Sequence, residues 1–275
     1  MNHCSLDNDR CPLSTEPAVV GDFQPFPFSG EFESLELDWS PLNRSIEDHR
    51  NFYSPHSLLW LTGGLAVGGL MANTSGDEVI QRHFQASVLG ASSDSWYEWF
   101  HASKELGNGY YTLPIMAGAY LTSELLPETT GAQRLRLWSE RSVRGTLVGA
   151  PPLIGLQLLT GGSRPNETDR GSRWSPFDDN NGISGHSFMG ALPFITAAKV
   201  SENRLEKAGW YAASFMAPLS RVNDDAHYPS QVALGWWMAY LAASAVATTD
   251  AQESIWVIVP YADANGTGVV GATRF

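Results

Sequence analysis

Three short motifs in the second half of the sequence contain the residues best suited to chemistry. They are Arg164-Pro165, then Ser184-Gly185-His186, then Ser220-Arg221 followed after five residues by His227. Two arginines offer forked donors that hold a tetrahedral oxyanion. Two histidines can act as a nucleophile and a general acid on opposite sides of one phosphorus atom. The residue types therefore predict phosphoryl transfer.

The second motif stands where a helix is predicted to begin. Ser184 is a good N-cap residue, and it precedes an apolar run through Phe188 and Leu192. We expect the backbone N–H groups of Ser184, Gly185 and His186 to point out of the helix N-terminus, where an anion is favoured. Gly185 has no side chain to obstruct that anion.

These motifs resemble those of the type-2 phosphatidic-acid phosphatase superfamily, which includes bacterial non-specific acid phosphatases and shares its site with vanadium haloperoxidases. The superfamily pattern is Lys, six residues, Arg-Pro; then Pro-Ser-Gly-His; then Ser-Arg, five residues, His, three residues, Asp. The resemblance covers the stretch from about residue 157 to residue 231.

The resemblance implies a role for each matching residue. His227 would attack phosphorus to give a phosphohistidine that water resolves, and His186 would protonate the leaving alkoxide. The implied catalytic residues are His227, His186 and Gln231, and the implied phosphate-binding residues are Arg164, Ser184, Gly185, Arg221 and Gln157.

Three positions depart from the superfamily pattern, of which Ile183, in place of the proline before Ser184, is a mild change. Gln157 stands where the lysine is expected, and it keeps a hydrogen-bond donor but lacks the charge. Gln231 stands where the aspartate is expected, so it can accept a hydrogen bond from Nδ1–H of His227 but is neutral and one methylene longer. Arg144 and Arg173 are candidates for supplying the missing charge.

Structural interpretations of the same side chains stay open at this point. Each histidine can be a satisfied core or loop residue. Each arginine has acidic neighbours for an ion pair: Glu167 and Asp169 near Arg164, and Asp224 and Asp225 near Arg221.

Composition restricts the class of protein and its partners. The chain has 275 residues, 43% of them hydrophobic, which excludes a disordered chain. Its net charge of -12 repels nucleic acids and anionic membrane surfaces. A small phosphorylated substrate remains compatible, because arginines within a pocket outweigh a distant field.

Several stretches without Asp, Glu, Lys or Arg predict the elements that position the motifs. They are residues 51–76, 106–123, 145–163, 180–198, 208–220 and 226–249. Their length and their Leu, Ala and Met content predict an all-α fold, a compact bundle of about six core helices. We favour a soluble bundle, because the best candidate for a membrane span, residues 58–72, is short and rich in glycine.

The remaining segments complete the predicted organisation. We expect residues 1–50 to form an extended N-terminal arm and residues 51–275 to form a single helical domain. The polar stretch 160–182 reads as a long loop, of a kind that is often functional. Two β-prone runs around Asn265-Gly266 predict a short C-terminal β-hairpin.

The sequence gives weaker indications of the cellular compartment. Cys4 and Cys11 lie in the first dozen residues, where they belong to a dispensable tail or form a local disulfide. No signal peptide is recognised in the sequence as given. The resemblance nevertheless suggests a periplasmic or secreted protein, in preference to a membrane protein.

The leading functional hypothesis is a metal-independent phosphomonoesterase acting on a small phosphorylated substrate, with a lipid phosphate as one candidate. No cofactor is expected, and vanadate is expected to act as a transition-state mimic. The alternatives are a catalytically weakened relative that binds a phosphate-bearing ligand or protein partner, and, ranked below it, a vanadate-dependent haloperoxidase. The sequence does not indicate the oligomeric state.

Overall fold

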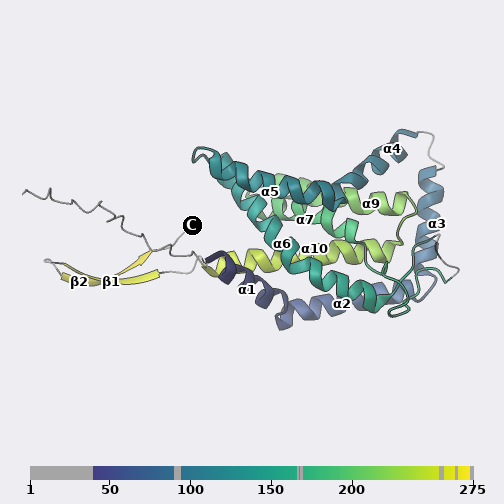
Figure 1. Cartoon of the computed structure of the whole chain (residues 1–275), viewed down its shortest axis with the longest axis horizontal. Helices are drawn as coiled ribbons and strands as arrows, with labels where there is room; N and C mark the ends of the chain where they lie inside the picture. The colour runs from purple at the N-terminus through teal and green to yellow at the C-terminus, as the bar shows by residue number, and fades with distance from the viewer. Residues whose placement is uncertain are drawn as a thin grey trace, which may run out of the picture. The chain divides into compact units, whose positions relative to one another are not determined.

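The computed structural model describes residues 40–89, 94–165, 167, 170–253, 257–263 and 266–272, and helices dominate it (Figure 1). In chain order the α-helices are α1 (Ser40–Phe52), α2 (Pro55–Ala72), α3 (Gly76–Leu89), α4 (Asp94–Ala102), α5 (Gly109–Leu125), α6 (Thr130–Thr160), α7 (Gly185–Val200), α8 (Arg204–Ala213), α9 (Met216–Asn223) and α10 (Pro229–Glu253). A short 3-10 helix, η1 (Ser103–Gly107), precedes α5. Strands β1 (Val257–Asp263) and β2 (Gly266–Ala272) pair antiparallel.

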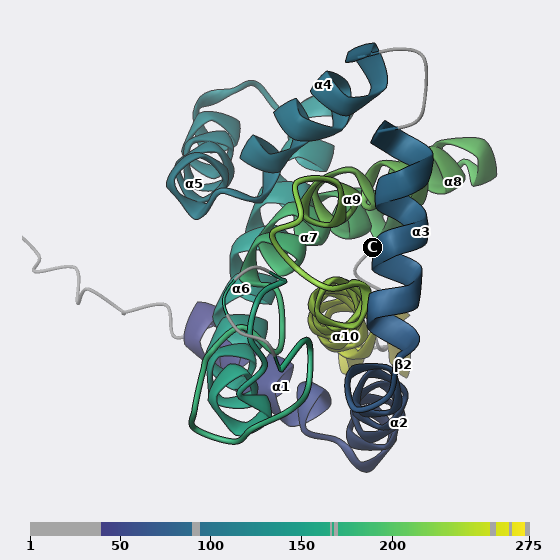
Figure 2. The ribbon, with the colours of Figure 1, turned by 90° about the vertical axis from the view of Figure 1, so that its right-hand side faces the viewer.

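Helix α10 is the centre of the bundle. It contacts α7, α6, α1, α2, α9 and α3, and the end-on view shows these helices around it (Figure 2). Residues 226–249 carry no Asp, Glu, Lys or Arg, so the helix can be packed on all sides. Among the described residues, only Pro229–Gln252 forms a helix long and apolar enough to cross a membrane, and most of it is buried inside the bundle.

The helical class predicted from the uncharged stretches is confirmed in the described part of the chain. Helices α2, α5, α7, α10 and the second half of α6 coincide with such stretches. The stretch 208–220 is divided between α8 and α9, with Ser214 as the C-cap of α8. The Ser214 hydroxyl accepts a hydrogen bond from the Trp236 indole (2.8 Å), which ties this break to α10.

The predicted N-terminal arm is wrong for residues 40–50, because they belong to α1. The side chain of Asp48 is 1% exposed and accepts two hydrogen bonds from the Arg144 guanidinium, at 2.8 and 2.7 Å. Arg44 and Asp48 of this segment therefore pair with α6, whereas Glu47 and Arg50 pair with each other on the exposed side of α1. Residues 1–39, the rest of the predicted arm, lie outside the described residues.

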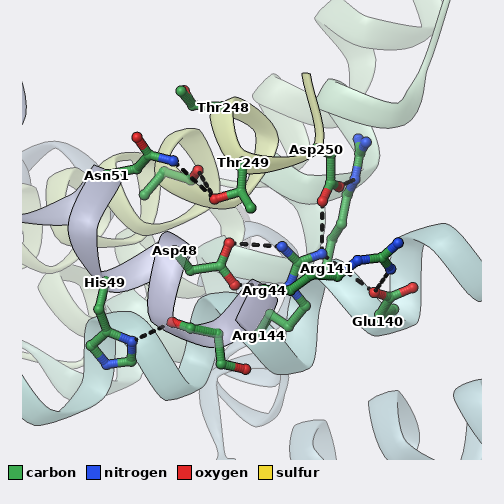
Figure 3. A network of polar contacts seen from close by, with 12 residues as sticks. Arg44, Asp48, His49, Asn51, Glu140, Arg141, Arg144, Thr248, Thr249 and Asp250 are labelled. Carbon is green, nitrogen blue, oxygen red and sulfur yellow. Dashed lines mark hydrogen bonds and ion pairs between the residues drawn. The ribbon is translucent and has the colours of Figure 1, made fainter. Parts of the chain in front are cut away.

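Arg144 also holds the far end of α10. Its Nη1 donates to Asp250 Oδ1 at 2.8 Å, and Arg141 pairs with the same carboxylate. Figure 3 shows Arg144 between Asp48 and Asp250, with Glu140 beside it. The pairs join α1, α6 and α10 through one buried guanidinium.

The loop after α6 folds back onto the end of that helix. Gly161 caps α6 in the left-handed conformation (φ 57°), and a Cβ there would lie 1.8 Å from the Ser175 carbonyl oxygen. Three backbone hydrogen bonds then hold the loop: Ser175 to Thr160, Phe177 to Leu158, and Asn181 to Gly162. Turns and bends continue to residue 182, in agreement with the loop predicted for residues 160–182. The loop thereby carries Arg164 to the start of α7.

Candidate active site

The three sequence motifs meet where α7 and α10 begin. The backbone N–H of Ser184 donates to the Gln231 carbonyl oxygen at 2.9 Å, although 47 residues separate them. A Cβ at Gly235 would lie 2.3 Å from the Ser184 carbonyl oxygen, so α10 approaches the start of α7 more closely than any side chain allows. This contact brings His186 and His227 into one site.

Gln231 fixes the orientation of the His227 ring. Its Nε2 donates to the Ser163 carbonyl oxygen at 2.8 Å, so its Oε1 is the atom that faces His227 Nδ1 at 2.9 Å. The same oxygen accepts the backbone N–H of Tyr228 at 3.2 Å. An acceptor at this place requires a proton on Nδ1, which leaves His227 Nε2 unprotonated. Gln231 thus supplies a neutral acceptor for Nδ1–H at the position where the resemblance expects an aspartate.

Both histidines are held toward the neutral form in the free protein. Burial lowers the pKa of His227 to about 3; the hydrogen bond with Gln231 opposes this, and the charges of Arg164 and Arg221 add to it. Partial enclosure of the ring lowers the pKa of His186, and the nearby charges of Arg221 and Arg164 lower it further. Two positive charges near two neutral rings favour an anion between them.

The depressed pKa of His227 predicts a pH dependence of stability. Because its pKa is about 3 when folded and about 6.5 when unfolded, the unfolded state binds more protons between these values. The neutral His227 ring therefore contributes to the free energy of unfolding fully above pH 6.5. This contribution falls by about 1.4 kcal/mol for each pH unit below that value. We expect the free energy of unfolding, measured by urea titration, to fall between pH 7 and pH 5 in the parent. In His227→Gln this fall should be smaller by about 2 kcal/mol. Equal pH dependence in the two proteins would contradict the buried neutral ring.

The two arginines are held by different partners. Arg164 Nε donates to Asn181 Oδ1 at 3.0 Å, and Glu167 lies 3.7 Å away, while about half of the Arg164 side chain remains exposed. Arg221 is mostly buried, and its nearest carboxylate oxygen, on Asp224, is 3.5 Å from Nη1. The ion pairs left open by the sequence therefore exist, but both are long. They leave guanidinium donors for an anion.

The start of α7 corrects one expectation and supports another. The backbone N–H of Ser184 cannot bind phosphate as expected, because it donates to Gln231, and the Ser184 hydroxyl accepts from Ser187 N at 3.3 Å. Gly185 and His186 are the first two residues of α7, so their N–H groups have no helical acceptor. A Cβ at Gly185 would meet only Gln157 Nε2, at 3.7 Å. Space is thus left in front of those donors.

Gln157 lies beside this space but is engaged elsewhere. Its Nε2 donates to the Ile183 carbonyl oxygen at 2.7 Å. The amide thus supports the turn before α7. Arg144 does not replace the missing lysine, because its donors bind Asp48 and Asp250. Arg173, the other candidate, is exposed and does not line the pocket in front of Gly185 and His186.

A pocket of about 410 Å³ opens over these residues. Its polar part is formed by Gln157, Arg164, Asn180, Asn181, Gly185, His186 and His227, and the rest by Gly107, Gly109, Ala150, Leu153, Ile154, Phe188 and Met189. Ser184 and Gln231 are fully buried and do not line it, and neither does Arg221, whose side chain is mostly buried behind it. The pocket therefore has a cationic end and an apolar wall from α6 and α7.

Several supporting residues were not identified from the sequence. Asn181 holds Arg164 and is itself bound to Glu167 and Asp179. Asp77 of α3 is fully buried and accepts from the backbone N–H of Ser230 at 2.8 Å, which anchors the first turn of α10. The only sequence signal for these residues is a polar side chain next to a helix end or a turn. Among the described residues, no group of three His, Cys, Asp or Glu side chains could hold a metal ion.

Comparison with known families identifies the same part of the chain. Residues 146–254 match the sequence model of the PAP2 superfamily, and this segment contains every residue that the motifs singled out. No curated protein and no solved structure matches the chain. Helices α1–α5 and η1 lie before the matched segment.

Proposed function

We propose that this chain, whose residues 146–254 belong to the PAP2 superfamily, is a metal-independent phosphatase that hydrolyses a phosphomonoester through a phosphohistidine intermediate. The observation that carries the proposal is the His227–Gln231 hydrogen bond, with Gln231 itself fixed by Ser163. It leaves a neutral Nε2 as a nucleophile at the cationic end of the pocket.

In the proposed reaction, His227 Nε2 forms a bond to phosphorus while the ester P–O bond breaks. Arg164, Arg221 and the N–H groups at the start of α7 bind the three non-bridging oxygens as charge develops on them. Protonated His186 gives its proton to the departing alkoxide. Neutral His186 then accepts a proton from water, whose oxygen attacks the phosphohistidine. Phosphate is released and His227 is restored.

The apolar wall supports a hydrophobic leaving group. Leu153 and Ile154 of α6, with Phe188 and Met189 of α7, lie beside His186 in the pocket lining. Burial of an apolar group there contributes about 25 cal/mol for each Å² removed from water. We therefore propose aryl or lipid monoesters as the substrate class, in preference to sugar phosphates.

The decisive experiment is the pH profile of kcat/KM for an aryl phosphate, with and without EDTA. His227 is neutral above about pH 3, and His186 must be protonated, with its pKa below 6.5. The profile should therefore rise to an acidic optimum and fall as pH passes the lowered pKa of His186. Arginines and helix N–H groups hold the phosphoryl group in this scheme, so EDTA should change nothing. Loss of activity in EDTA with recovery on adding Mg²⁺ or Zn²⁺ would overturn the proposal.

We expect phosphatase activity to rise when the two glutamines are replaced by the superfamily residues. Gln231→Asp places a carboxylate near His227, which raises the pKa of the ring and stabilises the cation formed on attack. We expect kcat to rise. Gln157→Lys adds a charge that acts on bound substrate and transition state alike, so we expect mainly a lower KM. Steady-state kinetics of both variants and of the pair test this. Losses in both variants would mean that these residues suit another reaction.

A second candidate function is a phosphate-binding relative with little turnover. The observation in its favour is the Gln157 amide, which donates to the Ile183 carbonyl oxygen in place of a charged side chain reaching into the pocket. Calorimetric binding of phosphate, without release from an aryl ester in the parent or in the repaired variants, would favour this function. Haloperoxidase activity gains no support from any contact in the site.

A further inference from the structure

A row of polar contacts runs from outside the matched segment to Arg221. Lys104 Nζ lies 2.9 Å from His101 Nε2, and His101 Nδ1 lies 3.0 Å from Asp224 Oδ1. Asp224 Oδ2 lies 3.5 Å from Arg221 Nη1. His101 lies in the last turn of α4 and Lys104 belongs to η1, so both precede the matched residues 146–254.

The donors in this row point in one direction. A lysine ammonium only donates, so His101 Nε2 must accept its hydrogen bond. The His101 proton is then on Nδ1 and is donated to Asp224 Oδ1. Asn223 Nδ2 donates to the same oxygen at 3.1 Å. One oxygen of Asp224 is therefore occupied by two donors, and only the other faces Arg221.

This arrangement prevents a two-point pair between Asp224 and Arg221. Carboxylates and guanidinium groups favour paired, parallel hydrogen bonds when both are free to form them. Here the contact is single and long, and Arg221 Nε is buried without a hydrogen-bond partner in the described residues. Buried donors are nearly always satisfied, so this unpaired nitrogen, on a guanidinium whose charge acts on His186 and His227, points to an anion as its partner.

We propose that His101 and Lys104 are positioning residues that restrain Asp224, so that Arg221 keeps its donors for the phosphoryl group. The proposal rests on the proposed function of the pocket. Asp224 neutralises part of the Arg221 charge in the free protein without competing for Nε. Without His101, the Asp224 side chain can rotate onto Arg221 and compete with the bound anion.

The segment that carries these residues also touches the site directly. A Cβ at Gly107, the last residue of η1, would lie 2.4 Å from the His186 carbonyl oxygen. Helix α9, which contains Arg221, contacts both α4 and η1. The part of the chain before the matched segment therefore reaches Arg221 and His186, and it can change the affinity of the site for phosphate.

Calorimetric titration of the full chain with orthovanadate tests the proposal, alongside KM for an aryl phosphate. We expect His101→Leu to raise both the vanadate Kd and KM about tenfold, with kcat changed less. His101→Asn keeps a donor near the Nδ1 position and should remain within about threefold of the parent. Adding Asp224→Asn to His101→Leu should restore binding, because a neutral amide competes weakly for Arg221. The matched control is His83→Leu on α3, whose vanadate Kd and KM should equal those of the parent.

Each outcome decides between the proposals. A merely structural His101 would lower the melting temperature but leave the vanadate Kd unchanged, and that result would overturn the positioning role. Failure of Asp224→Asn to restore binding would overturn it as well. Should His101→Leu not fold, Lys104→Met carries the test, with a rise of about threefold in Kd expected and no rise counting against the proposal. If the parent itself does not bind vanadate, the proposed function fails, and the positioning role fails with it.

Discussion

His227→Asn should lose about 10⁴-fold or more in kcat while remaining folded. Asparagine places an amide N–H near the position of Nδ1, so the bond to Gln231 Oε1 can persist. It removes Nε2, the atom that is proposed to attack phosphorus. His227→Ala should lose at least as much, because it removes the nucleophile and also leaves a cavity. Stopped-flow and steady-state release of an aryl alcohol measure both variants.

A control and a direct observation accompany this result. His83→Asn changes a histidine of α3 that is outside the pocket lining, and its kcat should match the parent. Acid-quenched parent mixed with labelled substrate should contain phosphohistidine at residue 227, whereas His227→Asn should contain none. Full activity in His227→Asn would exclude the histidine-nucleophile mechanism and indicate that water attacks phosphorus directly.

Arg144→Met should lower the free energy of unfolding by about 3–5 kcal/mol, the largest stability effect we expect from a single polar substitution. Arg144 is 8% exposed and binds Asp48 and Asp250 with bonds of 2.7–2.8 Å. Burial alone would lower its pKa, but the bonds to Asp48 and Asp250 raise the pKa above its ordinary value. Methionine fills much of the space but leaves two buried carboxylates without their partner.

Arg136→Met provides the matched control for the stability effect. Arg136 lies on the same helix and pairs with Glu124 at 2.8 Å, but its side chain is 51% exposed. An exposed pair of this kind contributes about 0–1 kcal/mol. Urea unfolding of both variants separates the two cases. A small effect of Arg144→Met would mean that the two carboxylates are satisfied without the guanidinium, and would contradict its structural role.

The residues that gather at the candidate site could be named from the sequence because each motif is local. Ser184 before an apolar run specifies a helix start, and the short spacing between Arg221 and His227 keeps the last turn of α9 close to the residues just before α10. The structure brings these pieces together. The resemblance implied that Gln231 accepts a hydrogen bond from His227 Nδ1, and the two atoms lie 2.9 Å apart.

Contacts between distant residues could not be predicted in this way. The bond from Ser184 N–H to the Gln231 carbonyl has no signature in either segment, so the donor was assigned to phosphate. The same holds for Arg144, whose partners are 96 and 106 residues away. Polar composition suggested an extended arm at residues 40–50, since charges that pair with a buried arginine look the same in sequence as solvated ones.

Helix α10 connects the candidate active site to the opposite end of the bundle. Gln231 stands near one end and Asp250 near the other, about 28 Å apart along a single helix. Through Asp250 and Arg144 the far end is fastened to α1, more than a hundred residues before the first motif. We therefore expect the smallest cooperative folding unit to extend from α1 to α10, well beyond residues 146–254. In native-state hydrogen exchange, the amides of α1 and those of the first turns of α10 should open together, so that occupancy of the pocket by an anion slows exchange in α1 as well.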